Sequence, residues 1–529
     1  MGWWAKSLLI FNSLQEYGKQ SIRELARRTG LSKSSVHRHL QAVERRDRYP
    51  ESGLWETPEG RHWLLRLVVA TLFIFGLKRG VGTETISEFF HRLHLEVHMG
   101  CSPSALRSLI HRLEQSIVET TVAWEHEGIE HGEIRPIIGA VDETFLQRMM
   151  LVFMDLASGY LLVEEVAVDR TYETWKRLVK ARLTTLGVEV SYLVSDRAKA
   201  LIKLAQTGLA CLSIPDLFHL SHDLAKTYSL AIYSRLRQAQ QALTQAQKRL
   251  ARLEAYEPGS IEVQQTQRSV ATHEAERKRW QEVHSAYRQH LGNLSLLLHP
   301  WCLVNSTRQT SNKVECRLQA EIEALASLVE QQGLPTKPNT LAKVCKQLAG
   351  ISALIDFWWQ TVEHDLEQMA MTARWRQWVD ELLLPLMYWQ EQLSRTRGSS
   401  LKAPIAQALK AAQDTFEKHP CTRQLAPEVL ADWKTWAAEH ARAFQRASSA
   451  VEGRNGYLSQ MQQQHRGLPK RRYTVWKVLH NFDCRASDGT TPASRFFRRA
   501  FPDLFESVFS QIDDLPQPRQ RTQVLVVND

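Results

Sequence analysis

The sequence has few cysteines, and none are closely paired. Its seven Cys, at positions 101, 211, 302, 316, 345, 421 and 484, are odd in number and include no CxxC pair. A zinc ribbon needs such pairs and a complete disulfide framework needs an even number, so neither is expected. This usage fits a reducing compartment, and we expect a cytoplasmic, nucleoid-associated bacterial protein.

Long hydrophobic runs are also scarce. The most apolar stretch, Trp63 to Leu77, is shorter than the roughly 20 residues of a spanning helix, and it contains Arg66. Met1 to Ser13 has neither a basic n-region nor a small-residue cleavage site, which argues against a signal peptide. We expect a buried core helix at 63–77 and no membrane partner.

Positive charge is present in excess. The 529 residues carry a formal net charge of +10, with 43% hydrophobic and 23% charged residues. This composition is ordinary for a globular chain, and at about 150 residues per domain it predicts three or four domains. The charge suggests nucleic acid as a partner, although a modest excess spread over a long chain also fits no such partner.

One stretch, 137–196, carries the pattern on which the functional hypothesis depends. Apolar runs cover 137–141, ending at Asp142, then 150–154 and 161–168, and the last two flank a turn at 157–159. Such runs predict a hairpin of buried strands. Helical spacing follows over Thr171 to Leu186, and after Gly187 a fourth apolar run leads to Asp196. The predicted order is strand, strand, strand, helix, strand.

This order brings two acids together. A crossover helix makes the fourth strand parallel to the first, so Asp142 and Asp196 are expected at the same end of the sheet. Two converging carboxylates favour a hard cation such as Mg²⁺. The alternatives are structural: Asp142 would cap a turn, and Asp196 would cap a helix over 198–205.

The pattern resembles the RNase H-like core of DDE transposases from bacterial insertion sequences. That resemblance implies two Asp and a later Glu on a helix, which bind two Mg²⁺ ions, with Mn²⁺ as a substitute. The best match to the Glu is Glu452, in SSAVEGRNG at 448–456, ahead of the basic run HRGLPKRR at 465–472. The implied catalytic and metal-binding set is Asp142, Asp196 and Glu452. The family's Lys two turns after the Glu is absent, because Ser459 takes that place.

The first 48 residues show a second motif. Ser21 and Glu24 form a capping box, Gly30 makes a tight turn, and Ser32 caps a helix that is polar and basic on one side. This is the helix-turn-helix pattern, whose second helix enters the major groove, with a plain helical hairpin as the alternative. The candidate DNA contacts on that helix are Lys33, Ser34, Ser35, His37 and Arg38, with His39 placed near the same side.

Further basic residues are candidates for phosphate contact. Arg107, His111 and Arg112 lie in a region that is either a second helix-turn-helix or a plain helical domain. Near the predicted acids, the DNA-binding candidates are Arg197, Lys199, Arg454, Arg466, Lys470, Arg471 and Arg472.

The fold class expected is an α/β RNase H-like core, a mixed sheet with flanking helices, interrupted by a large all-α insertion and preceded by helix-turn-helix DNA-binding domains. The segments are 1–50, a helix-turn-helix domain; 51–130, a second helical domain; 131–215, the first part of the core; 216–440, the insertion with a coiled-coil arm at 230–298; 441–480, the helix of the catalytic Glu; and 481–529, a basic region and tail. Within the insertion, His219 is assigned a structural role and the tryptophans are assigned to core packing.

The function expected is therefore that of a transposase. It would bind insertion-sequence ends as a homodimer or higher oligomer on double-stranded DNA and catalyse metal-dependent strand cleavage and transfer. Two alternatives remain: an inactive or domesticated DNA-binding regulator, and an RNase H-like structure-specific nuclease without strand transfer.

Overall fold

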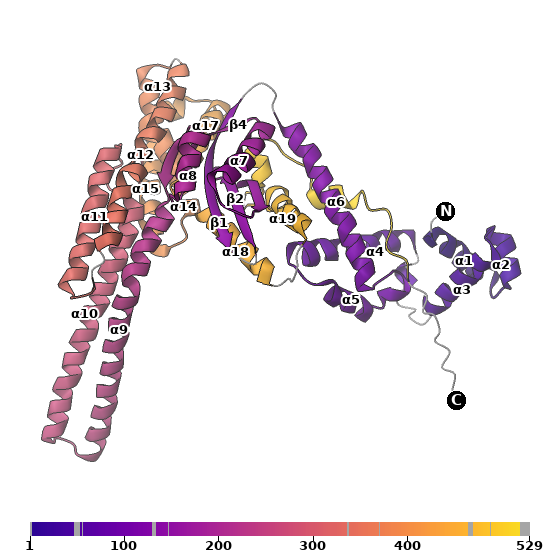
Figure 1. Ribbon diagram of the computed structural model, residues 1–529, viewed down its shortest axis with the longest axis horizontal. Helices are drawn as coiled ribbons and strands as arrows, with labels where there is room; N and C mark the ends of the chain where they lie inside the picture. The colour runs from indigo at the N-terminus through magenta and orange to yellow at the C-terminus, as the bar shows by residue number, and fades with distance from the viewer. Residues whose placement is uncertain are drawn as a thin grey trace.

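The protein is extended, with its sheet between two helical regions. The computed structural model describes residues 3–46, 53–55, 57–129, 134–145, 148–335, 338–369, 371–463, 469–486 and 488–518. The N-terminal helices lie at one end of the molecule, and a long helical arm projects from the other side of the sheet (Figure 1).

The sheet has five strands in the order β3-β2-β1-β4-β5. Strands β1 (Arg135–Phe145), β2 (Met149–Asp155) and β3 (Tyr160–Val166) are antiparallel neighbours. Strands β4 (Val188–Ser195) and β5 (Leu212–Pro215) extend the sheet in parallel with β1. The predicted order of four strands and the parallel pairing of the fourth with the first are confirmed. The short fifth strand was not predicted.

The crossover helix α7 (Tyr172–Leu186) forms where its spacing predicts. Thr171 caps its first turn by accepting a hydrogen bond from the Thr174 backbone N–H, and Gly187 ends it with a φ of 63° that favours glycine. Trp175 and Val179 are fully buried on one face. Beyond β4, the helical turn α8 (Lys199–Lys203) and a π-helical segment, Leu204–Gly208, lead into β5.

The N-terminal domain has its own small core. Helices α1 (Trp3–Tyr17), α2 (Ile22–Thr29) and α3 (Lys33–Arg46) pack around Ile10, Leu25 and Val36, each 0% exposed. The Ser21 hydroxyl accepts from the Glu24 N–H, and Gly30 takes a φ of 69° in the turn between α2 and α3. The helix-turn-helix predicted from the sequence is confirmed.

Residues 57–129 form a helical region that packs into the large hydrophobic core around the sheet, the main core of the protein. Helix α4 (Pro58–Thr71) continues into the π-helical segment Leu72–Lys78, and α5 (Thr83–Arg92) and α6 (Pro103–Gly128) follow. By length and composition alone the 21 residues Pro58–Lys78 are sufficient to cross a membrane, but half of the most apolar window is buried in the protein. Leu64 and Val68 belong to the main core, as expected of a core helix. The phosphate-contact candidate Arg107 is exposed and forms an ion pair with Glu84, at 2.7 Å.

The predicted arm is an antiparallel helical hairpin. It consists of α9 (Leu217–Tyr256) and α10 (Ile261–Leu297), with Gly259 in the turn between them at a φ of 83° (Figure 1). The helices that follow are α11 (Ser311–Gln331), α12 (Pro338–Gln368), α13 (Ala373–Trp378), a π-helical segment (Val379–Leu383), α14 (Leu384–Arg395), α15 (Ser399–Lys418), α16 (Pro420–Gln424) and α17 (Pro427–Ala443). Trp358, Trp359, Trp378 and Trp389 are all buried, which supports the assignment of these aromatics to core packing.

The chain then returns to the sheet. Helix α18 (Ser449–Gln463) contacts β1 and β2, and α19 (Lys470–Phe482) contacts β3 and α6. Short helices α20 (Pro492–Phe496) and α21 (Leu504–Phe509) follow. The tail expected from residue 515 is packed at its start, because Leu515 is buried and the Pro516 carbonyl accepts from the Gly100 N–H. Residues 519–529 lie outside the described part of the chain.

Candidate metal centre and DNA-binding helix

Asp142 lies on β1, toward its carboxyl end, and its two carboxylate oxygens have different partners. The Glu143 backbone N–H donates to Oδ1 at 2.9 Å. The Asn455 side-chain amide, from α18, donates to Oδ2 at 2.7 Å. The carboxylate is therefore held in one orientation by its own strand and by the helix that packs across the sheet.

Glu452 lies close to this carboxylate although the whole helical insertion separates the two residues in the sequence. One ligand atom from each of Asp142, His219 and Glu452 lies within 4.8 Å of the others. The loop before α18 is fixed to the start of α9, because the Ser448 N–H donates to Asp216 Oδ1 at 3.1 Å. This anchor positions the first turn of α18, where Glu452 is located.

His219 and Asp216 complete the cluster, and sequence reasoning gave neither a functional role. His219 Nδ1 lies 2.7 Å from Asp216 Oδ2, and its Nε2 lies 3.5 Å from Glu452 Oε1. Asp216 directly follows β5, so it stands at the same edge of the sheet as Asp142. If Leu212–Pro215 is predicted as a strand, Asp216 follows a third parallel strand, just as Asp142 and Asp196 stand at the ends of the other two. The sequence would then predict that Asp216 lies at the same edge of the sheet.

Asp196 lies at the same edge but outside the cluster. Ala140 pairs with Val194, so Asp142 and Asp196 are each two residues farther along neighbouring parallel strands. The Asp196 side chain is exposed, and its Oδ1 accepts from the Ala198 N–H at 2.8 Å. The structure thus brings Asp142 and Glu452 together and leaves Asp196 as a neighbour in the turn after β4.

The charges in the cluster perturb one another. Burial raises the pKa of Asp142 to about 7, and the negative charge of Glu452 acts in the same direction. The hydrogen bond to Asp216 raises the pKa of His219 to about 9, with help from the charges of Asp216, Asp142 and Glu452. At neutral pH the metal-free site therefore holds an imidazolium among three carboxyl groups, one of which is partly protonated.

These residues fit a divalent cation. Two carboxylates and an imidazole are a donor set that Mn²⁺ accepts, and Mg²⁺ would use the carboxylates. A cation would relieve the repulsion between Asp142 and Glu452, which adds to the effect of burial on the Asp142 pKa. The buried Asn455 Oδ1 has no hydrogen-bond partner among the described residues, so the site also retains an unused oxygen acceptor. The contact between His219 and Asp216 is the carboxylate–histidine arrangement that commonly orients metal ligands.

The affinity of this centre for Mn²⁺ is expected to rise with pH. Asp142 must release its proton to bind metal, so below pH 7 the affinity should fall roughly tenfold per pH unit from this group alone. If His219 also ligates, the rise continues toward pH 9, because the imidazolium must lose a proton too. Titration of Mn²⁺ followed by electron paramagnetic resonance from pH 6 to 9 measures both. An affinity independent of pH over this range would contradict the assignment.

Arg454 is not a DNA contact. Its guanidinium is buried and binds Glu164 on β3 through two hydrogen bonds, Nε to Oε2 at 2.6 Å and Nη2 to Oε1 at 2.8 Å. The side chains are 5% and 0% exposed. Arg454 therefore fixes α18 to the sheet, which positions Glu452 and Asn455. The sequence offered no sign of this role because the partner lies far away in the chain.

The other basic candidates differ in their availability. Arg472 is largely buried against Glu114, at 2.5 Å, and is also better explained as a structural ion pair. Arg471 is half-buried and lies 2.9 Å from His111 Nε2. Lys470 and Lys199 are exposed, and Arg197 is half-buried with a φ of 65° directly after Asp196. Arg466 lies outside the described residues.

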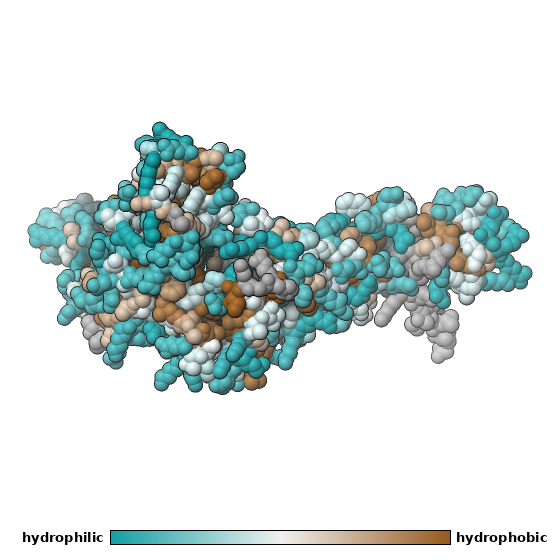
Figure 2. All heavy atoms as spheres, turned by 90° about the horizontal axis from the view of Figure 1, so that it is seen from above, coloured by the Kyte–Doolittle hydropathy of each residue, from teal (hydrophilic) through white to brown (hydrophobic). Residues whose placement is uncertain are grey.

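Helix α3 presents the polar surface expected of a recognition helix. Lys33, Ser34, His37 and Arg38 are exposed and Ser35 is half-buried. His39, placed near the same side from sequence, is buried at 2% exposure and therefore does not belong to this exposed surface. Figure 2 shows mostly hydrophilic residues over this domain at the right-hand end of the molecule.

The fold and these surfaces define a DNA-binding protein with a mixed α/β core. Comparison with known families supports the DNA-binding domain. Residues 5–47 match the IclR helix-turn-helix domain, so the chain binds DNA through an IclR-type domain. Residues 379–524 match a family of unknown function, DUF6399, and this region includes Glu452 and Asn455 but neither Asp142 nor His219. A search among curated proteins finds no match to the chain.

DNA binding by α3 is expected to depend on charge. Replacing Arg38 with Ala should weaken binding about uniformly across DNA sequences if it contacts phosphate, and lower the slope of log affinity against log salt by about 1. Electrophoretic mobility shift at several salt concentrations measures this slope. The matched control is Arg27→Ala on α2, which is exposed but outside the recognition helix. An equal loss in both variants would argue against α3 as the contacting helix.

Proposed function

We propose that the chain is a DDE-type DNA transposase. Its helix-turn-helix domain would bind the ends of the element, and the cluster around Asp142 and Glu452 would direct metal-dependent strand cleavage and transfer. The observation that carries the proposal is the meeting of these two acids, which come from β1 and from a helix beyond the whole insertion. The sheet supports it: three antiparallel strands followed by two parallel ones, in the order 3-2-1-4-5, is the arrangement of an RNase H-like core.

The residues of the site have separate roles in this proposal. A bound divalent cation would supply Lewis-acid stabilisation of the reacting phosphodiester and lower the pKa of an attacking water. Asp142 and Glu452 provide oxygen ligands, and Asn455 keeps the Asp142 carboxylate oriented. Asp216 orients the His219 ring toward Glu452. Asp196, exposed at the next strand end, is the candidate ligand for a second ion, and Mg²⁺ or Mn²⁺ are the ions expected.

DNA cleavage by the purified chain tests this proposal. The substrate is the DNA that flanks the gene, labelled at each strand, with Mg²⁺ or Mn²⁺ added and with EDTA as the metal-free comparison. We expect nicks at defined positions only in the presence of metal, and joining of pre-cleaved ends to a target plasmid. Binding without metal-dependent nicking would reject the enzymatic function while leaving the DNA-binding domain intact. Nicking without joining would instead indicate a nuclease.

One observation favours a second candidate, a DNA-binding regulator with an inactive core. Asp196 stands outside the 4.8 Å cluster, and a histidine cation is positioned between the acids instead. An arrangement of this kind would arise if the core served only as a scaffold for the helix-turn-helix domain. Sequence-specific DNA binding with no metal binding at the cluster would support the regulator.

A further inference from the structure

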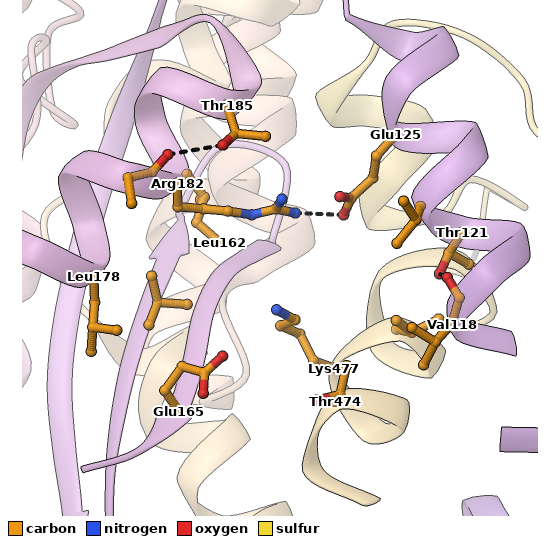
Figure 3. Close-up of a pocket in the computed structure, with 14 residues that line it drawn as sticks. Val118, Thr121, Glu125, Leu162, Glu165, Leu178, Arg182, Thr185, Thr474 and Lys477 are labelled. Carbon is orange, nitrogen blue, oxygen red and sulfur yellow. Dashed lines mark hydrogen bonds and ion pairs between the residues drawn. The ribbon is translucent and has the colours of Figure 1, made fainter. Parts of the chain in front are cut away.

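A pocket with a volume of about 290 Å³ lies between α6, β3, α7 and α19 (Figure 3). Its walls are largely apolar and include Val118 on α6, Leu162 on β3, Leu178 on α7 and Val478 on α19. No member of the acid cluster lines it. Its volume is close to the lower end, about 300 Å³, of small-molecule sites in proteins.

Two of the charged groups in this pocket satisfy each other. Arg182 Nη2 lies 2.5 Å from Glu125 Oε1, an ion pair drawn in Figure 3. The Tyr160 hydroxyl donates to the same Glu125 oxygen. These groups form one hydrogen-bonded network in the wall, in which the buried Arg182 Nε still has no hydrogen-bond partner among the described residues.

Two other charged groups remain unpaired. Within the described part of the chain, the Lys477 ammonium has no hydrogen-bond or ion-pair partner, and neither does the Glu165 carboxylate. Figure 3 shows both directed toward the open space of the pocket. Burial lowers the pKa of Lys477 and the nearby Arg182 cation acts in the same direction, while the charges of Glu125, Glu165 and Glu164 offset these effects only in part. An ammonium enclosed by apolar walls costs free energy unless an anion pairs with it.

We propose that this pocket binds a small apolar α-amino acid. The carboxylate of the ligand pairs with Lys477, its ammonium pairs with the more exposed Glu165, and its side chain packs on the valine and leucine walls. Opposite unpaired charges beside an apolar wall are the features of a zwitterion site. A simple anion would satisfy Lys477 but leave Glu165 without a partner, and a simple amine would do the reverse.

Binding in this pocket would stabilise the contact between two parts of the chain, the helical region of α6 and the sheet. The ligand would contact α6, which belongs to the helical region after the DNA-binding domain, together with β3 and α7 of the sheet domain. The expected effect is a stabilised contact between these parts, and the proposal is independent of any catalytic activity.

Calorimetric titration of the full chain with L-leucine tests the proposal. We expect saturable binding with a dissociation constant on the order of 100 μM, a value typical of a ligand this small. The comparison ligands are 4-methylpentanoate, which lacks the ammonium, and 3-methylbutylamine, which lacks the carboxylate. Each should bind at least about tenfold more weakly, since each leaves one charge unpaired. Absence of saturable leucine binding, or equal binding of all three compounds, would overturn the proposal.

Variants locate the site. Lys477→Met keeps the apolar stem and should lower leucine affinity at least tenfold, while the thermal midpoint of the ligand-free protein rises because a buried charge is removed. Glu165→Gln should weaken leucine but not 4-methylpentanoate. Lys180→Met is the matched control, since Lys180 is exposed on α7 and does not line the pocket. Unchanged leucine affinity in a folded Lys477→Met variant would place the ligand elsewhere and overturn the assignment.

Discussion

Replacing Asp142 with Asn is expected to lower metal-dependent DNA cleavage by about 1,000-fold or more while DNA binding is retained. The Asp142 carboxylate accepts hydrogen bonds from Glu143 and Asn455, and it lies beside Glu452 and His219 in the cluster. Asparagine keeps the shape but removes the negative charge that a divalent cation requires. A loss of about 4 kcal/mol of transition-state stabilisation corresponds to this change in rate. Glu452→Gln should give a similar loss, because Glu452 provides the other carboxylate proposed to bind the cation.

The experiment needs two readouts and one control. Single-turnover cleavage rates measure the chemical step, and mobility shift measures binding through the separate N-terminal core. Glu189→Gln is the control, since this exposed acid lies on β4 away from the strand end that carries Asp196. Cleavage by Asp142→Asn at the wild-type rate would remove the residue from the catalytic role.

Replacing Arg454 with Ala is expected to lower the free energy of unfolding by about 3–5 kcal/mol. The substitution leaves the fully buried Glu164 carboxylate on β3 without its two charge-assisted hydrogen bonds. Helix α18 would lose its anchor to the sheet, so the metal affinity of the cluster should fall as well. The shift of the urea midpoint for the transition that includes the sheet measures the effect.

The double variant Arg454→Met, Glu164→Leu separates charge burial from packing. Replacing both partners with apolar residues of similar length is often neutral for stability. The double variant should therefore recover most of the free energy of unfolding that Arg454→Ala loses. Arg498→Ala is the matched control, because its ion pair with Glu439 is largely exposed and contributes at most about 1 kcal/mol. A single Arg454→Ala variant as stable as the wild type would show that the pair does not hold α18.

Sequence reasoning succeeded where the signal was local. The hairpin of β2 and β3, the helical spacing of α7 and the turn at Gly30 depend on neighbouring residues, and the predictions agree with the structure. The parallel pairing of β1 and β4 followed from the crossover helix, which is itself a local feature.

It was less successful where the deciding partner is remote. The sequence predicts surface cations at Arg454 and Arg472. Their ion-pair partners, Glu164 and Glu114, are hundreds of residues away in the chain, so no local pattern indicates the pairs. The sequence predicts only a structural role for His219, because β5 is four residues long and too short for its pattern to predict a strand. The convergence of Glu452 on Asp142 could be expected only from a family resemblance, since no periodicity links residues on opposite sides of an all-helical insertion.

Iron-mediated cleavage of the polypeptide tests the central claim most directly. Fe²⁺ bound in place of Mg²⁺ or Mn²⁺ generates hydroxyl radicals in the presence of ascorbate and peroxide, and these cut the backbone close to the ion. The account predicts cuts near Asp142, His219 and Glu452 that excess Mn²⁺ suppresses and that Asp142→Asn lacks. Cuts confined to other parts of the chain, or none that Mn²⁺ suppresses, would contradict a metal centre at this edge of the sheet.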